Sequence, residues 1–188
     1  MTKPVLAVAA LLALAACGGG EEPAPAAGAA SPAARDATPA TTGCRGTLTG
    51  PQPGAFTCMA VANQDADPER SAAGKSSIVT VLSNPYDPSH KRPEGVKSIG
   101  FNFELKGEPT MGTFSIDDAG AATTGAVVYD EGPQFDKIRS LTLDLTQAAF
   151  ESEQSGFGMT SRVYKINGTL KATLADPEGR ELVVEAEF

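Results

Sequence analysis

The chain has 188 residues, with 15 Lys or Arg against 23 Asp or Glu, which gives a formal net charge of -8. This acidic balance contains no basic stripe or Lys/Arg cluster, which excludes nucleic-acid binding and peripheral electrostatic binding to a membrane. Trp is absent and Tyr occurs three times, so the usual aromatic platforms for sugars or bases are scarce.

The first 16 residues have the three parts of a secretory signal. Lys3 provides a positive start, residues 5–14 are an apolar run, and Leu14-Ala15-Ala16 ends in small residues. An apolar run of about ten residues is far shorter than the ~20 needed to span a bilayer. We therefore expect residues 1–16 to be a cleaved signal peptide.

A cysteine follows the small residues directly. The segment Leu14-Ala15-Ala16-Cys17 resembles the lipobox of bacterial lipoprotein precursors at all four positions. The resemblance implies diacylglyceryl transfer to the Cys17 thiol, cleavage before Cys17 and acylation of the new amino terminus. Two or more acyl chains give a lasting membrane anchor. The alternative is a plain secreted protein with an accidental cysteine.

The residue after Cys17 indicates whether a lipoprotein is expected in the inner or the outer membrane. In Gram-negative lipoproteins, Asp at that position often signals retention in the inner membrane. Gly18 stands there in this chain. The resemblance therefore implies the outer membrane, with the periplasmic or the surface face left open.

Cysteine parity agrees with lipid on Cys17. The chain has three cysteines, and an exported protein with an odd number has one left to explain. If Cys17 carries lipid, Cys44 and Cys58 remain as a pair in an oxidising compartment.

Residues 17–43 are almost entirely Gly, Ala, Pro, Glu, Ser and Thr, without large apolar side chains after Cys17. Such a segment cannot bury enough surface to offset its ordering entropy. We expect a disordered tether over 17–43 and a folded domain over 44–188.

From Cys44 onward, apolar and polar residues alternate with a period of two, as half-buried strands require. Turn residues separate the alternating stretches. We expect an all-β, antiparallel fold of about eight or nine strands, either a sandwich or a partly open barrel. Residues 146–153 could form one short helical turn. The expected strands are 45–49, 55–61, 77–82, 101–106, 111–116, 125–130, 141–146, 162–174 and 181–188.

Asn167-Gly168 is a strong hairpin cue between apolar stretches. A two-residue turn there would set Ile166 opposite Thr169 and so mix apolar and polar residues on one face. A continuous strand instead places Tyr164, Ile166 and the apolar residues up to position 174 together. We expect a continuous strand with a bend at Gly168.

Cys44 and Cys58 flank a turn cluster at residues 50–54. If the flanking strands pair with Cys44 opposite Cys58, Gly46 faces Phe56 and Leu48 faces Gly54. The cysteines then lie on the inner face, and Arg45, Thr47 and Thr57 point outward. We expect a cross-strand disulfide between Cys44 and Cys58. A redox-active pair would normally have Cys-X-X-Cys spacing, which is absent here.

The single histidine, His90, lies in a proline-rich loop that also contains Asp87 and Ser89. Adjacency in sequence is not the geometry of a catalytic triad. We expect a stiff, exposed loop without catalytic function. Lys91-Arg92 in this loop is an unusual basic pair on an acidic domain and could contact a partner.

Metal sites have weak support. Asp65, Asp67 and Glu69 place carboxylates at alternate positions, as calcium loops do. Arg70 stands where an EF-hand needs glycine, so we expect a solvated acidic loop. Asp117-Asp118 is expected to end a strand in a turn.

The stretch 156–159 is glycine-rich and is expected to form a loop. Phe157 and Met159 there could form an exposed contact patch, although packing of the loop against the domain is the favoured interpretation.

The folded domain loosely resembles the small β-rich lipoproteins of unknown function found in Gram-negative bacteria. The likeness rests on the lipobox, the early cysteine pair, Gly168-Thr169-Leu170 and an alternating strand that finishes at Phe188.

No catalytic or cofactor motif is present, so we expect a non-enzymatic interaction or structural module of the envelope. Its partner would be an envelope protein or the cell wall. The alternatives are a small-ligand or glycan-binding module, and a hydrolase with a carboxylate pair.

Overall fold

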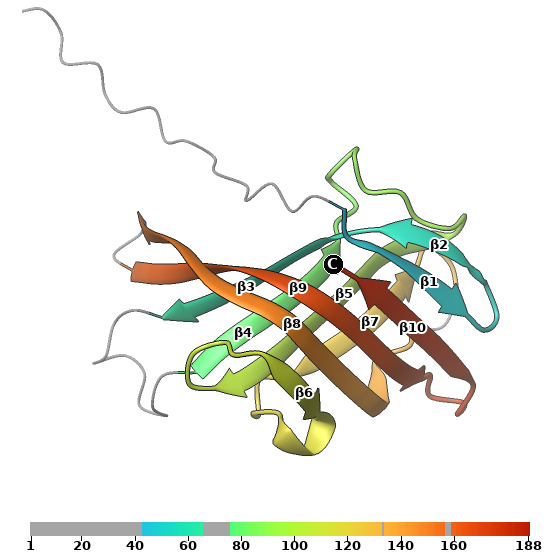
Figure 1. The fold of residues 1–188 in the computed structure, drawn as a ribbon. Coiled ribbons are helices and arrows are strands. Elements are labelled where there is room, and N and C mark those ends of the chain that lie inside the picture. Colours follow the sequence, from blue (N-terminus) through green and yellow to red (C-terminus); the bar gives the residue numbers. More distant parts are fainter. Residues whose placement is uncertain (1–42, 66–75, 133, 157–158) are drawn as a thin grey trace, which may run out of the picture. The chain divides into compact units, whose positions relative to one another are not determined.

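The computed structural model describes residues 43–65, 76–132, 134–156 and 159–188, and these form an antiparallel β domain (Figure 1). The helical structure in these ranges is one 3₁₀ turn, η1 (Ile116–Asp118). The ten strands are β1 (Arg45–Thr49), β2 (Gly54–Thr57), β3 (Met59–Asp65), β4 (Ser76–Ser83), β5 (Val96–Lys106), β6 (Gly112–Ser115), β7 (Thr124–Tyr129), β8 (Lys137–Gly156), β9 (Met159–Ala175) and β10 (Glu181–Glu187).

All ten strands belong to one sheet with the order β2-β1-β10-β9-β3-β4-β5-β7. β8 pairs with the other edge of β9, and β6 pairs with β8. β9 therefore has three neighbours: β8 along its whole length, β3 at residues 161–164 and β10 at residues 169–175. The sheet branches where β3 and β10 diverge from β9.

The sheet curls so that strands distant in its order face each other. Phe103 of β5 and Phe114 of β6 have ring centroids 6.5 Å apart. The segment after β7 turns back and Phe135 forms a bridge with Val127 of β7. The all-β, antiparallel prediction is confirmed, and a single curled sheet agrees with the partly open barrel rather than with two separate sheets.

The alternating residues predicted to face inward form the core. All three members of each predicted set in β5 and β8 are buried, as are the inward residues of β9 and β10. They are Phe101, Phe103 and Leu105 in β5, Leu141, Leu143 and Leu145 in β8, Tyr164, Ile166, Leu170, Ala172 and Leu174 in β9, and Leu182, Val184, Ala186 and Phe188 at the C-terminal end.

Two strand predictions need correction. The expected strand 55–61 is broken at Cys58 into β2 and β3, which pair with different neighbours. The helical turn expected at residues 146–153 is wrong, because this stretch continues β8. Bulges at Thr146 and Glu151 interrupt its alternation, and pairing with β9 overrides the local preference for a turn of helix.

The continuous strand through Asn167-Gly168 is confirmed. Gly168 lies opposite Leu145 in the β8–β9 ladder. A Cβ at position 168 would lie 2.1 Å from the backbone oxygen of Asp144, so the close approach of β8 requires glycine. On its other side, the Gly168 amide donates to the Phe188 carbonyl at 2.7 Å.

The disulfide between Cys44 and Cys58 and the predicted register are confirmed. The two Cα atoms are 4.9 Å apart, Gly46 pairs with Phe56, and Leu48 pairs with Gly54. Both cysteines are buried. The bond joins the start of β1 to the junction of β2 and β3.

A short turn connects β9 to β10 through a buried carboxylate. The Asp176 side chain accepts the Arg180 amide at 2.8 Å and the Arg180 Nε at 2.7 Å. Burial raises the pKa of Asp176, but the hydrogen bonds and positive charge of Arg180 outweigh it and hold that pKa below its ordinary value. The ionised carboxylate therefore stabilises the turn.

Removing the disulfide with a Cys44→Ala/Cys58→Ala variant should destabilise the domain by about 3 kcal/mol, because the bond closes a loop of about 15 residues in the unfolded chain. The measurement is urea unfolding of the oxidised wild type and of the variant. An unchanged urea midpoint would contradict a structural disulfide. As a chemical check, alkylation of the unfolded, unreduced protein should label neither Cys44 nor Cys58.

The Asp176→Asn variant should unfold more easily than the wild type at pH 7. A carboxyl with a lowered folded-state pKa stabilises the fold above its ordinary pKa of 3.8, and loses that effect as pH falls through the lower folded value. The gap in urea midpoint between wild type and variant should therefore shrink as pH falls below about 4.

Glu178→Gln is the matched control, because Glu178 is exposed and lies 3.3 Å from the same guanidinium. It should change the midpoint less at pH 7. A gap for Asp176→Asn that stays constant between pH 7 and pH 2 would refute the role of the ionised carboxylate.

Candidate functional site

The loop that contains the single histidine is held together by a hydrogen bond to its ring and has a structural role. The Asn84 amide donates to Nδ1 of His90 at 2.9 Å, and Nε2 lies 3.6 Å from Asp87. The imidazole is 8% exposed, although the loop around it reaches the surface, as predicted, with Tyr86 89% exposed. The proline-rich loop folds around the ring, and a backbone amide of the loop donates a hydrogen bond to one ring nitrogen.

Ser89 and Asp87 do not form a relay with His90. The Ser89 hydroxyl and amide both donate to Asp87, at 2.6 and 2.9 Å. These two hydrogen bonds lower the pKa of the Asp87 carboxyl, and the one from the hydroxyl has the larger effect. A triad needs the serine on the imidazole, whereas here both Ser89 donors face the carboxylate.

The same loop covers the outer edge of β2. The Thr57 amide donates to the Lys91 carbonyl at 2.9 Å, and the Lys91 amide donates to the Thr57 hydroxyl at 2.7 Å. The guanidinium of Arg92 donates to the Asn84 carbonyl at 2.7 Å. The Lys91-Arg92 pair is thus divided: Arg92 holds the loop together, and Lys91 lies beside β2.

The acidic candidates are placed as follows. The Asp118 carboxylate accepts hydrogen bonds from the Ser115 amide and hydroxyl, each at 2.8 Å. The hydrogen bond from the amide is the main cause of the lowered pKa of Asp118. This confirms a capped turn after β6. Asp67 and Glu69 of the calcium candidate lie outside the described residues. Within 43–65, 76–132, 134–156 and 159–188, no three His, Cys, Asp or Glu side chains gather to hold a metal.

The remaining sequence candidates lie largely outside the described residues. The lipid-attachment candidate Cys17 lies outside them, as do Phe157 and the side chain of Met159 from the candidate contact patch. Gly156 and Met159 pair at the end of the β8–β9 ladder.

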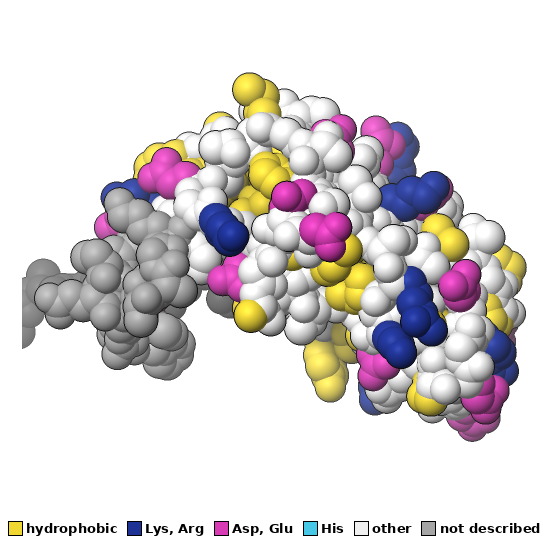
Figure 2. Space-filling model, turned by 90° about the horizontal axis from the view of Figure 1, so that it is seen from below, with side chains coloured by type: hydrophobic (Ala, Val, Ile, Leu, Met, Phe, Trp, Pro, Cys, Tyr) yellow, Lys and Arg dark blue, Asp and Glu magenta, His cyan; other side chains and the backbone are white. Residues whose placement is uncertain are grey.

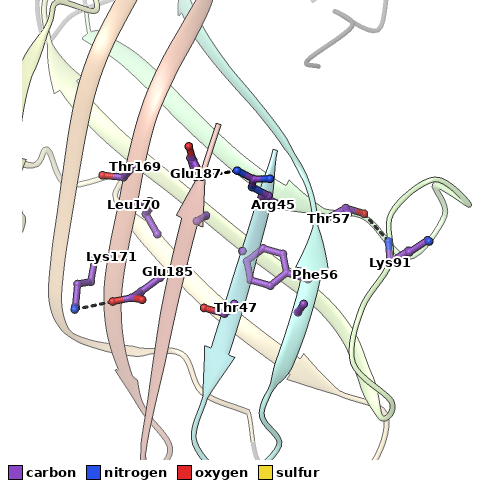
Figure 3. Close-up of a pocket in the computed structure, with 13 residues that line it drawn as sticks. Arg45, Thr47, Phe56, Thr57, Lys91, Thr169, Leu170, Lys171, Glu185 and Glu187 are labelled. Atoms are coloured by element: carbon purple, nitrogen blue, oxygen red, sulfur yellow. Dashed lines mark hydrogen bonds and ion pairs between the residues drawn. The ribbon is translucent and has the colours of Figure 1, made fainter. Parts of the chain in front are cut away.

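A groove of about 690 Å³ lies across strands β2, β1, β10 and β9 (Figure 3). It was not predicted. Outward-facing side chains of these strands and Lys91 line it, together with the residues that alternate with them. The lining residues are Arg45, Gly46, Thr47, Ala55, Phe56, Thr57, Lys91, Thr169, Leu170, Lys171, Glu185, Ala186 and Glu187.

The outward side chains of the groove form two rows that cross the four strands. The strand registers place Thr57, Arg45, Glu187 and Thr169 in the first row. They place Ala55, Thr47, Glu185 and Lys171 in the second row.

Each row contains one ion pair between neighbouring strands. Arg45 lies 3.1 Å from Glu187, and Lys171 lies 2.6 Å from Glu185 (Figure 3). The groove therefore presents paired charges beside threonine hydroxyls and methyl groups.

Beneath these rows, Gly46 of β1 and Phe56 of β2 pack against each other on the inner face of the sheet. A Cβ at Gly46 would lie 2.3 Å from the Phe56 ring, so this ring covers the inner side of Gly46. Phe56 is 2% exposed and belongs to the core rather than to an aromatic platform in the groove. Gly46 therefore leaves room both for the ring under the strand and for the close approach of the Glu185 carbonyl of β10.

The chemistry of the groove suits binding. Its two carboxylates, Glu185 and Glu187, are 53% and 65% exposed and each faces a cation. Glycosidases instead use one carboxyl kept protonated by its surroundings and a second one across the scissile bond. Exposed ion pairs contribute little to stability, so these four side chains are available to rearrange around a ligand.

One face shows hydrophobic side chains in small patches between acidic and basic groups (Figure 2). No helix among the described residues is long and apolar enough to cross a membrane. No family model, curated protein or solved structure matches this chain.

Sequence reasoning found the outward orientation of Arg45, Thr47 and Thr57 but not the groove. The missing information was the register between β1 and β10, in which Arg45 lies opposite Glu187. The positive charge of Arg45 and the negative charges of Glu185 and Glu187 were a usable signal. They would have suggested the pairing but not the concave surface.

Proposed function

We propose that this chain is a lipid-anchored lipoprotein of the cell envelope, attached through Cys17, whose β domain is a non-enzymatic interaction module. The groove across β2, β1, β10 and β9 would be its binding surface. The lipobox resemblance supports the anchor. The groove supports the interaction.

The observation that carries the binding role is the combination of a concave surface with ion pairs that lie across strands. Arg45–Glu187 and Lys171–Glu185 offer donors and acceptors on both sides of short Thr and Ala side chains. Such pairs can exchange their mutual contacts for contacts to a polar partner. An envelope protein or a cell-wall polymer has groups of both kinds.

A small-ligand or glycan-binding role is the second candidate. A volume of about 690 Å³ is within the range of small-molecule sites, which is about 300–1,000 Å³. The hydroxyls of Thr47 and Thr169 and the ion pairs would bind hydroxyl groups. The buried position of Phe56 leaves no exposed ring to stack on a sugar within the groove residues.

The anchor predicts that Cys17→Ser abolishes lipid attachment. The measurement is incorporation of a labelled fatty acid into the protein, followed by partition into detergent phase. The Cys44→Ser/Cys58→Ser variant is the control and should retain its label. Undiminished label in Cys17→Ser would overturn the lipobox interpretation.

The binding surface predicts site-specific crosslinking. A photoreactive amino acid at Thr47, inside the groove, should capture a partner in native envelopes. The same residue at Thr124, which is exposed at the start of β7 and does not line the groove, is the matched control.

Mass spectrometry of the adducts distinguishes the candidates. Protein or polymeric glycan on Thr47 in excess over Thr124 supports the interaction module, and a single small molecule supports the second candidate. Adducts with lipid alone, or equal adducts at both positions, would contradict both.

A further inference from the structure

The edges of the sheet differ in how they are covered. The loop around Ser89–Lys91 hydrogen-bonds to the outer edge of β2, and Phe135 bridges to the outer side of β7. β6 is a short edge of four residues. β8 is the exception, because β6 covers its outer side only at residues 142–145.

Residues 147–156 of β8 pair with β9 on one side and, within the described residues, with no strand on the other. At about 3.3 Å per residue this open edge is about 33 Å long. Peptide groups of alternate residues face outward in an antiparallel strand, so about half of the residues present an unpaired N–H and C=O. Exposed edges of this length are usually blocked by Lys or Pro.

The side chains of this edge lack both protective residue types. The stretch 147–156 contains no Lys, Arg or Pro. Its charges are Glu151 and Glu153, of which Glu153 lies 3.7 Å from Arg162 of β9. Phe150 is 59% exposed and contacts Tyr164 edge-on, with ring centroids 6.0 Å apart.

We propose that the outer edge of β8 at residues 147–156 is a second binding surface, which takes an extended segment of another protein as an additional antiparallel strand. The unpaired backbone groups determine that the partner is a polypeptide in β conformation. Glu151 and Glu153 favour Lys or Arg in that segment, and Phe150 favours an apolar side chain next to them. The inference is independent of the groove.

A second copy of this chain fits the edge less well. It would bring the same acidic residues and the same bulges at Thr146 and Glu151. Bulges bend and twist a strand, so two such rigid edges would have to match their irregularities. A flexible segment of a partner can follow the twist instead.

The test uses the full-length protein and two synthetic peptides, one of six Lys-Val repeats and one of six Glu-Val repeats. They have the same length and strand-forming alternation and opposite charge. Backbone hydrogen exchange should slow at residues 147–156 with the Lys-Val peptide and stay unchanged with the Glu-Val peptide. Protection elsewhere, protection by both peptides or protection by neither would overturn the proposal.

Two variants separate the edge from general acidity. Glu151→Lys should weaken binding of the Lys-Val peptide about fivefold or more, because an attractive cross-strand pair becomes repulsive. Glu131→Lys makes the same charge change in the exposed turn after β7 and should bind as the wild type does. Equal weakening in both variants would show attraction to the acidic domain as a whole.

The oligomeric state gives the last discriminating result. Light scattering should show a monomer without peptide. A dimer whose 147–156 amides are protected without peptide would assign the edge to a second copy and overturn the partner proposed here.

Discussion

The arrangement of the domain depends on how β9 shares its two edges. β8 occupies one edge throughout, and the other is divided between β3 and β10. The division falls at Gly168, where the backbone bonds to Phe188 on one side and lies against Asp144 on the other. A side chain at this position would push β8 away from β9, so the close approach of these two strands beside the branch requires the glycine.

Both candidate surfaces follow from this branch. β10, β1 and β2 extend from the C-terminal part of β9, and the disulfide joins β1 to the chain that continues into β3. The groove lies across these strands because their registers align the outward residues in two rows. At the other part of β9, β8 runs beyond the end of its pairing with β6, and its outer edge is left open.

The parts of the fold that sequence predicted well are those with strict alternation. Residues 101–105, 141–145 and 181–188 each placed their apolar side chains in the core, because burial of one face is a local property of a strand. The hairpin of Cys44 and Cys58 was also predictable in register, since one covalent link sets every pair between β1 and β2.

The failures have equally local causes. The second half of β8 was taken for a helical turn because bulges at Thr146 and Glu151 shift its alternation. The exposed loop around His90 was predicted, but not that its ring is buried there, with the Asn84 amide donating to Nδ1. Neither a bulge nor a loop that closes around a side chain produces a periodic pattern of apolar and polar residues in the sequence.

By itself, the sequence determined the strand content, the inward and outward faces, the disulfide and the candidate lipid site at Cys17. These follow from the types of neighbouring residues and from cysteine parity. Only the tertiary structure decided which strands pair over long separations, as Arg45 does with Glu187. Many pairings bury the same apolar faces equally well, and the choice among them depends on the packing of the whole sheet, including the glycine at 168 and the ring of Phe56 over Gly46.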